Sequence, residues 1–205
     1  MASAKKFAAP EQVKIELPAL DIQTIKLTLI GDSALICHAW SEKAKKQMRD
    51  KQMKRAVDKK EAKDPKADFL ASLYPLPGKK DSYGFPAVAF KSAAVNAARF
   101  SEGLKMTELR GALHIEGDLV PIEGKPTMRE DMVRLNGMTA DIRYRGQFEK
   151  WRAALVIRFN ARMFTPEQIA NLFNAAGFGV GIGEWRPERN GSFGRFHVAS
   201  GKETR

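Results

Sequence analysis

The chain has 205 residues, of which 43% are hydrophobic, and its 35 Lys/Arg against 24 Asp/Glu give a formal net charge of +11. This length suits one domain with a full core, alone or with an inserted element, and argues against two large domains. No apolar run approaches the ~20 residues of a membrane span, so we expect no membrane partner. The excess of positive charge attracts polyanions, and nucleic acid, RNA or DNA, is the first partner to test.

The chain has one cysteine, Cys37, which excludes an internal disulfide framework and makes a cytoplasmic setting the default expectation. The three histidines are scattered without metal-ligand spacing, so we expect no metal and no cofactor. Residues 1–12 contain two lysines but no long apolar stretch after them, which is typical of a flexible arm and not of a secretory signal. We assign residues 13–200 to a single domain and residues 201–205 to a flexible tail.

The first strand is expected within residues 13–31. Ile25, Leu27 and Leu29 alternate there with polar residues, as in a half-buried strand. Gly31 and Asp32 break the pattern, and a short apolar run then leads to Ser41, a suitable N-cap.

Residues 42–63 form a predicted basic helix, the main part of an inserted element at residues 41–81. The helix holds ten Lys/Arg and four Asp/Glu, and its apolar residues are too sparse for a broad packed face. It is either a solvated helix that protrudes from the body or a basic arm that follows phosphates, and one does not exclude the other. Residues 64–81, with three prolines, are expected to be a returning loop. The candidate phosphate contacts of the arm are Lys45, Lys46, Arg49, Lys54 and Arg55.

The middle of the chain predicts a helix over residues 84–100, rich in alanine, and a strand over residues 109–120 with an exposed His114. Residues 121–137 contain two glycines and two prolines, which predicts a turn-rich connection or mobile hairpin. It carries a second basic cluster with Arg129 and Arg134.

Two further strands are expected at residues 139–145 and 151–159. Arg143 and Arg145 share one face of the first strand, and Arg152 and Arg158 share one face of the second. An antiparallel pairing of the two strands would gather four guanidinium groups on one surface. The alternative is that these arginines only solvate the outside of a sheet.

The last helix has the clearest signals. Thr165, Pro166 and Gln168 provide an N-cap, an N1 proline and the N3 residue of a capping box. An apolar stripe follows from Ile169, and Gly177 suits the C′ position that ends a helix.

Residues 177–198 hold six of the chain's sixteen glycines, interleaved with arginines and aromatic residues. Glycine occurs at such density where the backbone needs positive φ, or where something approaches it closely. A phosphodiester fits the second reading, because arginines and bare backbone N–H groups bind phosphate. The alternative is a turn that touches nothing, before a strand at residues 194–199. The candidate contacts are Gly181, Gly183, Trp185, Arg186, Arg189, Gly194, Arg195 and Phe196.

The order of elements predicts an α+β fold in which helices back an antiparallel sheet. The ferredoxin-like or RNA-recognition-motif (RRM) split βαβ is the nearest standard form, here with a basic helical insertion.

Two segments resemble motifs of the RAMP superfamily, RNA-binding proteins of CRISPR effector complexes, and in particular their crRNA-coating backbone subunits. The segment FPAVAFKSA at residues 85–93 is similar to the motif that opens the family's first helix, although the family usually has glycine where Ala87 and Ser92 stand. The segments GVGIG and NGSFGRF look like the family's glycine-rich loop. The resemblance implies RNA contacts at Lys91, Gly181, Gly183, Gly194 and Arg195.

We therefore expect a non-catalytic protein that binds single-stranded nucleic acid, RNA before DNA, through phosphate neutralisation and base stacking. It would serve as a subunit of a nucleoprotein assembly, and a homo-oligomer or filament along the nucleic acid is left open. One alternative is a metal-free ribonuclease of the same fold with His38 or His197 as general base. Another is a phage or mobile-element interaction protein that mimics such a subunit. No G-x-S-x-G, H-E-x-x-H or Walker A motif is present.

Overall fold

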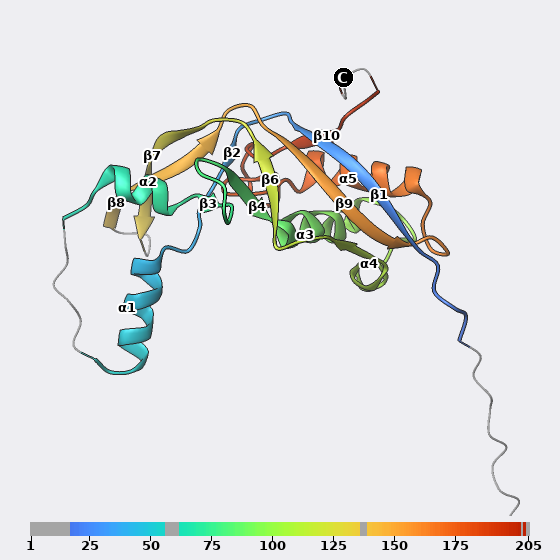
Figure 1. Cartoon of the computed structure of the whole chain (residues 1–205), viewed down its shortest axis with the longest axis horizontal. Coiled ribbons are helices and arrows are strands. Elements are labelled where there is room, and N and C mark those ends of the chain that lie inside the picture. Colours follow the sequence, from blue (N-terminus) through green and yellow to red (C-terminus); the bar gives the residue numbers. More distant parts are fainter. Residues whose placement is uncertain (1–16, 56–61, 136–138, 202, 204–205) are drawn as a thin grey trace, which may run out of the picture.

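The structure is a computed structural model that describes residues 17–55, 62–135, 139–201 and 203. Antiparallel strands form two sheets, and helices cover one face of the larger sheet (Figure 1). The predicted α+β class with a helix-backed antiparallel sheet is confirmed. The predicted N-terminal arm, and most of the predicted tail, lie outside the described residues.

The elements follow one another from Ile22 to Val198. The helices are α1 (Glu42–Gln52), α2 (Pro65–Ala71), α3 (Ala87–Ala97), α4 (Met106–Ala112), α5 (Pro166–Gly179) and the short 3-10 turns η1 (Ala98–Phe100) and η2 (Pro187–Arg189). The strands are β1 (Ile22–Gly31), β2 (Leu35–Ile36), β3 (Tyr74–Pro75), β4 (Tyr83–Pro86), β5 (Leu113–Ile115), β6 (Leu119–Glu123), β7 (Pro126–Leu135), β8 (Thr139–Phe148), β9 (Arg152–Asn160) and β10 (Phe196–Val198).

The larger sheet has the strand order β10-β1-β9-β6-β4-β3, and β5 pairs with β9 beside this path. All of its pairings are antiparallel, and β1 pairs with β9 from Ile22↔Asn160 to Ile30↔Arg152. In chain order, β1, α3, β5 with β6, β9, α5 and β10 make a βαββαβ unit. Its fourth strand lies beside the first and its third beside the second, which is the ferredoxin-like arrangement.

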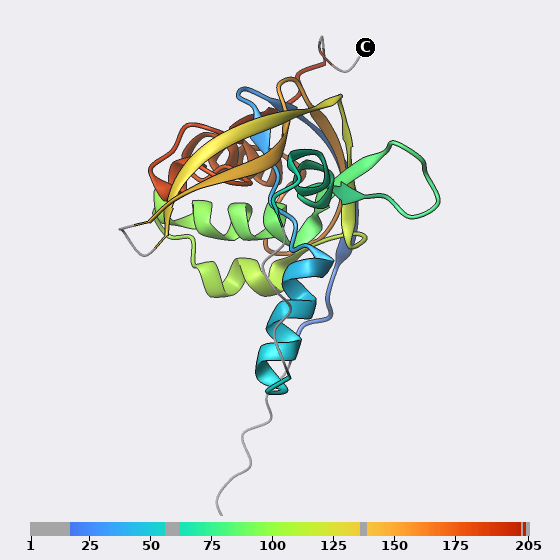
Figure 2. The same cartoon turned by 90° about the vertical axis from the view of Figure 1, so that its left-hand side faces the viewer.

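The core lies between this sheet and helices α3 and α5 (Figures 1 and 2). Leu29 of β1 and Ile157 of β9 point into it, as the alternation predicted, and each is fully buried. Phe90 of α3 and Phe173 of α5 fill it from the helix side, also with no exposed surface. Each such side chain contributes about 1.5–3 kcal/mol by leaving water, so the helices are held to one face of the sheet.

Helix α5 begins as predicted, because the Thr165 side chain accepts from the Gln168 backbone N–H while the Gln168 side chain accepts from the Thr165 N–H. Its predicted end is wrong. The helix passes through Gly177 to Gly179. A Cβ at Gly177 would lie 1.8 Å from the Phe196 carbonyl oxygen. Gly177 is therefore a point of close approach between α5 and β10, and not a C′ residue.

Strands β7 and β8 form a long hairpin where the sequence predicted a turn-rich connection or a mobile hairpin, followed by a separate strand. The connection is shorter than expected, because only Gly124 and Lys125 separate β6 from β7. Strand β8 pairs with β7 along its whole length and with β2, in a separate sheet of order β2-β8-β7. The predicted pairing of the strand at residues 139–145 with the strand at residues 151–159 is wrong, so the four arginines do not gather on one sheet face.

The inserted element also differs from the prediction. Helix α1 ends at Gln52, and Lys54 has a φ of +53°, which L-residues rarely adopt within a helix. Residues 56–61 of the predicted helix lie outside the described residues. The predicted loop 64–81 contains α2, capped by the Asp64 side chain, and β3.

Two predictions in the middle of the chain need correction. The first residues of the expected helix 84–100 belong to β4, and helix α3 starts only at Ala87. Helix α4 takes up the first part of the expected strand 109–120, which begins at Leu113 and continues after a turn as β6. Both errors concern three or four residues at the boundary of an element. In such short stretches the local pattern is weak, and tertiary contacts decide the structure.

Candidate nucleic-acid interface

Two segments about 90 residues apart in the sequence face each other across one groove of about 290 Å³. One wall is the start of α3 and the other is the glycine-rich loop after α5. The lining residues come from these two segments together with His38 and Tyr74: Phe85, Pro86, Val88, Ala89, Ser92, Ala93, Val180, Gly181, Ile182, Gly183, Glu184, Arg186 and Glu188. The segments FPAVAFKSA and GVGIG, which resemble RAMP motifs, thus line a single concave site, while Lys91, Gly194 and Arg195 lie outside its lining.

The glycines of the loop are explained by the chain's own backbone. Gly181, Gly183 and Gly194 have φ values of +69°, +79° and +65°, a region that favours glycine. A Cβ at Gly183 would lie 2.6 Å from the Ile36 carbonyl oxygen, and one at Gly194 would lie 1.7 Å from the Ile182 carbonyl oxygen. The need of the turn for positive φ and for close backbone contact therefore explains these glycines without a ligand.

A fully satisfied carboxylate fixes Arg186 in the loop. Glu188 Oε2 accepts from Arg186 Nε at 3.1 Å and Nη2 at 2.8 Å. Glu188 Oε1 accepts from Asn96 Nδ2 at 2.9 Å and from Arg99 Nη2 at 3.4 Å. Arg186 Nη1 also donates to the Gly183 carbonyl at 3.1 Å. Arg186 is thus positioned by the loop itself and, through Glu188, by α3, and its guanidinium donates three hydrogen bonds inside the protein.

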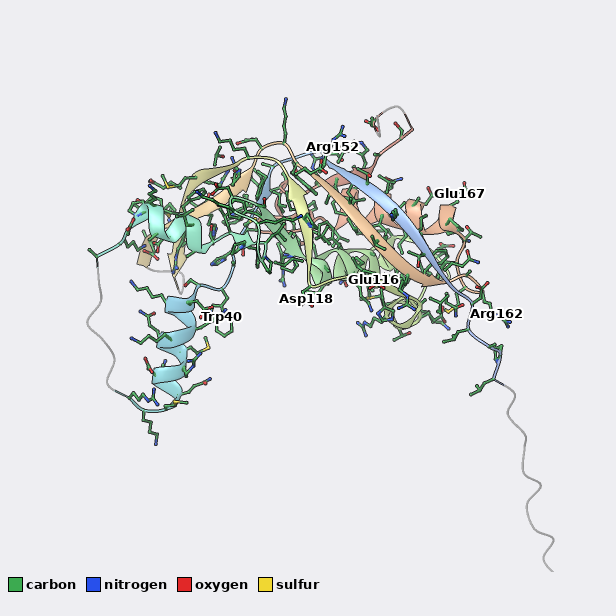
Figure 3. All side chains as sticks on the ribbon, in the orientation of Figure 1. Trp40, Glu116, Asp118, Arg152, Arg162 and Glu167 are labelled. Atoms are coloured by element: carbon green, nitrogen blue, oxygen red, sulfur yellow. The ribbon has the colours of Figure 1, made fainter. Side chains whose placement is uncertain are left out.

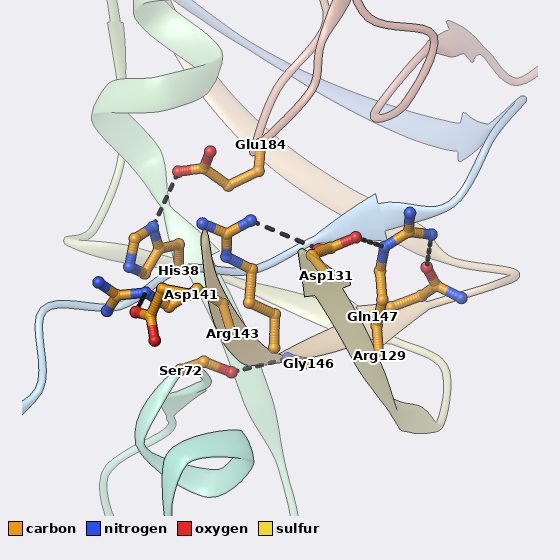
Figure 4. Close-up of polar contacts among 10 residues, drawn as sticks. His38, Ser72, Arg129, Asp131, Asp141, Arg143, Gly146, Gln147 and Glu184 are labelled. Atoms are coloured by element: carbon orange, nitrogen blue, oxygen red, sulfur yellow. Dashed lines mark hydrogen bonds and ion pairs between the residues drawn. The ribbon is translucent and has the colours of Figure 1, made fainter. Parts of the chain in front are cut away.

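Glu184 and His38 form a pair at the rim of the groove (Figure 4). His38 Nδ1 lies 3.0 Å from Glu184 Oε1, and the Glu184 backbone N–H donates to the Ile36 carbonyl at 3.1 Å. The hydrogen bond from His38, with the charges of Arg145 and Arg186, lowers the pKa of Glu184 despite its partial burial. Glu184 is therefore a charged acceptor near neutral pH, and His38 Nδ1 is the donor.

The arginines of the β7–β8 hairpin mostly hold it in place (Figure 4). Arg129 Nε donates to Asp131 Oδ1 at 2.7 Å, and its guanidinium lies 4.8 Å from the centre of the Phe193 ring. Arg145 is buried and reaches Asp131 Oδ2 at 3.4 Å. Arg143 Nε pairs with Asp141 Oδ2 at 2.9 Å. Among these candidates the exposed Arg134 is the most accessible.

Arg152 and Arg158 lie on the open face of the larger sheet, as the alternation predicted. Both side chains are exposed, and every second residue between them is buried in the core. Arg158 pairs across the sheet with Thr24 of β1, whose exposed Lys26 lies two residues further on the same face. Arg152 lies at the start of β9, at the edge of the molecule (Figure 3). Arg158 Nε also lies 3.6 Å from Glu116 Oε1, and Arg152 pairs across the sheet with Glu123, so each arginine on this solvated face has an acidic neighbour.

Three candidates of the inserted element, Lys45, Lys46 and Arg49, lie on helix α1, which protrudes from the body, while Lys54 and Arg55 follow the end of the helix (Figures 1 and 2). Lys45 Nζ pairs with Glu42 at 2.6 Å and lies 5.9 Å from the centre of the Trp40 ring. Arg55 pairs with Asp50 at 3.5 Å. The side chains of Lys46, Arg49 and Lys54 are exposed.

The remaining candidates divide between surface and core. Lys91 Nζ lies 3.2 Å from His114 Nδ1. Arg189 is exposed, and Arg195 Nε donates to the Ser192 carbonyl at 3.3 Å. Phe196 is a correction, because its side chain is only 1% exposed and packs against Trp151 in the core. Its ring cannot stack on a base while the protein is folded.

Trp185 keeps 41% of its surface exposed and has a φ of +55°.

The sequence did not reveal that Glu184 is the partner of His38, because no local spacing links residues 146 positions apart. It also missed Tyr74, whose hydroxyl donates to the His38 carbonyl at 3.3 Å. Only the tertiary fold brings these three residues together.

Within the ranges that the structure describes, no group of three or more His, Cys, Asp or Glu side chains could hold a metal ion. The same ranges contain no helix that is long and apolar enough to cross a membrane. Neither finding identifies a ligand.

No protein-family model matches the chain, and no curated protein matches it. Among solved structures, the fold is similar to the crystal structure of Cmr6 from Pyrococcus furiosus, with a TM-score of 0.44 and 12% sequence identity. The match covers 88% of this chain and 100% of the Cmr6 chain. At this TM-score and identity the likeness supports no argument about function, which has to be inferred from the geometry of the chain itself.

Proposed function

We propose that the chain binds single-stranded nucleic acid, RNA in the first place, without catalysing a reaction on it, and that it does so as a RAMP-like subunit of a nucleoprotein assembly. The observation that carries the proposal is the groove, in which the two segments that resemble RAMP motifs face each other. The basic helix α1 starts at Glu42, four residues after the groove residue His38. Four residues span at most about 14 Å, so a nucleic-acid strand that leaves the groove near His38 can reach the start of this helix.

Helix α1 contributes charge and very little packing. None of its residues, all of which the structure describes, is buried, and its sequence EKAKKQMRDKQ holds five Lys/Arg against two Asp/Glu. A helix without a buried face gains little from the core, so folding alone does not explain why it is present. A protruding cationic rod attracts a polyanion and releases its counterions on contact.

Each member of the His38–Glu184 pair has an exposed tryptophan close to it in the sequence. Trp185 follows Glu184 directly and is 41% exposed, and Trp40 lies two residues after His38 and is 57% exposed. A base stacked on an aromatic ring is worth about 1–3 kcal/mol, and stacking tolerates any sequence. Two such rings beside a groove and a cationic helix are the usual combination in proteins that bind single strands.

The experiment compares two variants that lose equal charge. In the first, Lys46, Arg49 and Lys51 of α1 become Gln, and in the second Lys105, Arg110 and Arg162 become Gln. The second set lies on and near α4 and after β9, at the end of the molecule away from α1 (Figures 1 and 3). Binding to a fluorescent, unstructured RNA 12-mer is measured by anisotropy at several salt concentrations.

We expect the α1 variant to reduce the slope of log K against log salt by about 2, because each phosphate contact of a single strand contributes about 0.7. The control variant should keep a slope near that of the parent. Equal loss in both variants would show that only the net charge matters and would contradict a contact on α1.

One observation favours a second candidate, the metal-free ribonuclease. The carboxylate of Glu184 orients His38 through Nδ1, and in a neutral imidazole with this hydrogen bond Nε2 carries the lone pair that a general base needs. Incubation of labelled RNA with the protein in excess chelator distinguishes the two functions. Intact RNA after overnight incubation supports binding alone, and cleavage that is lost in His38→Ala supports the ribonuclease. A protein that binds no RNA at all would leave the interaction-protein alternative.

A further inference from the structure

The polar side of the groove is unusual for a site that meets a polyanion, because a charged carboxylate faces it. Glu188 has no acceptor capacity left, since its two oxygens accept four hydrogen bonds from Asn96, Arg99 and Arg186. Glu184 differs. Its one hydrogen bond to another described side chain is with His38, and 40% of its side chain remains exposed. A carboxylate offers about four acceptor positions, so Glu184 can still accept.

This carboxylate decides which part of a nucleic acid the groove can take. A phosphate would be repelled by the negative charge of Glu184, and the guanidinium of Arg186 is already held by Glu188 and by the Gly183 carbonyl. The group that enters must instead donate hydrogen bonds. In a single strand the strong donors are the N–H groups of the bases and the ribose hydroxyls.

The size and the opposite wall of the groove favour a base. A volume of about 290 Å³ lies at the lower end of small-ligand sites and is far too small for a folded partner. The wall at the start of α3, with Pro86, Val88 and Ala89, is apolar, and Val88 is 71% exposed. An apolar wall can cover the face of a planar ring while the carboxylate reads its edge.

Among the four bases, guanine matches a fixed carboxylate best. Its Watson–Crick edge presents two neighbouring donors, N1–H and N2–H, which can meet the two oxygens of one carboxylate, as an arginine fork does. Adenine and cytosine place a ring acceptor next to their amino group, and uracil flanks its single N–H with two carbonyls. Each of these acceptors would face the negative charge of Glu184.

We propose that the groove between the start of α3 and the glycine-rich loop binds one unstacked guanine base of a single-stranded nucleic acid, with the Glu184 carboxylate accepting from guanine N1–H and N2–H. The proposal rests on the proposed function, since it names the base that the same groove takes. Phosphates stay outside the groove, on the cationic surface. The neighbouring Trp185 can stack the next base of the strand.

The test uses uridine 12-mers that carry one central guanosine, inosine, adenosine or cytidine, together with all-uridine RNA, in anisotropy titrations at fixed salt. We expect the guanosine strand to bind the parent about tenfold more tightly than the all-uridine strand, within the range of one bidentate base contact. Inosine keeps N1–H but lacks the amino group, so its strand should fall between the two. This comparison needs no variant and does not depend on how a substitution folds.

The variant Glu184→Gln replaces an acceptor-only group by one acceptor and one donor, and should bring the guanosine preference to within about twofold of the all-uridine strand. Glu167→Gln, which removes one negative charge at the exposed start of α5 away from the groove, should keep the full preference (Figure 3). A thermal melt confirms that both variants fold.

The outcomes separate the two claims. Binding of all five strands with equal affinity would overturn the guanine proposal and leave single-strand binding intact. An unchanged preference in Glu184→Gln would also overturn it. If no strand binds even at low salt, both the proposal and the proposed function fail.

Discussion

Replacing Gly194 with alanine tests why the loop is rich in glycine. Gly194 has a φ of +65°, its N–H donates to the Ala34 carbonyl at 2.8 Å, and its carbonyl accepts from the Ile182 N–H at 3.0 Å. An added Cβ would lie 1.7 Å from the Ile182 carbonyl oxygen, a distance at which the backbone has to move. Because Ile182 is 1% exposed and belongs to the core, the movement disturbs well-packed residues.

The expected loss of stability is the sum of two costs. A non-glycine residue in the left-handed region costs about 1–2 kcal/mol. Forcing extra atoms into a packed site costs about 1–3 kcal/mol more. The free energy of unfolding should therefore fall by about 2–5 kcal/mol. In a chain of this size each kcal/mol lowers the melting temperature by about 2–4 °C, so we expect a decrease of about 4–20 °C.

The assay pairs a thermal melt, followed by circular dichroism, with an RNA titration at a temperature where the variant is folded. Gly111→Ala is the matched control, because Gly111 lies in α4 and an added Cβ would have no atom within 4 Å. Alanine should stabilise that helix by up to about 1 kcal/mol. A Gly194→Ala protein that melts like the parent but binds RNA weakly would refute the structural explanation and show that the backbone meets the ligand.

Three further predictions concern other parts of the molecule. The double variant Arg152→Ala, Arg158→Ala should reduce the salt slope of RNA binding by about 1.4 and change the unfolding free energy by less than about 0.5 kcal/mol; an unchanged slope would remove the open sheet face from the interface. Burial raises the pKa of the Cys37 thiol to about 12, so iodoacetamide at about pH 8 should label the denatured protein and spare the native one, and equal labelling rates would contradict the buried position. Desolvation by itself lowers the pKa of His197, but the hydrogen bonds and charges of Asp32 and Glu203 outweigh it and raise the pKa above 6.5. The stabilisation is therefore complete at acid pH and is lost as pH rises through the raised value, so the parent should melt above His197→Gln by a margin that shrinks from about pH 6 to pH 8; a constant margin would disprove the coupling.

Elements with strong local signals were predictable from the sequence. The capping box at Thr165 and Gln168 depends on residues three positions apart, so it identified the start of α5 before any tertiary contact was known. The alternation in β1 and β9 likewise gave the correct buried faces, because the side chains of a strand alternate whatever its neighbours are.

The β7–β8 hairpin was not predictable in the same way. Its strand β7, PTMREDMVRL, is charged and contains a proline, which lowers its local strand propensity. It is held by pairing with β8 and by the buried Asp131, which accepts from Arg129 and Arg145. From the sequence alone these charged residues would be placed on the surface. Only the fold shows that they form ion pairs with one another.

The groove shows the same limit. The motif residues of α3 and of the loop could be identified separately, but their meeting depends on the packing of α3 against α5. Glu184 carried no recognisable signal, since its partner His38 lies in another part of the chain. A glycine-rich segment also indicates close approach without saying what approaches, and here the backbone around Ile182 occupies the space.

The measurement that tests the central claim most directly is the affinity of the parent protein for an unstructured RNA 12-mer as a function of salt. Contacts with three or more phosphates predict a straight line of log K against log salt with a slope of about −2 or steeper, because each contact contributes about −0.7. Binding of similar strength at low and moderate salt, or no binding at low salt, would contradict the account.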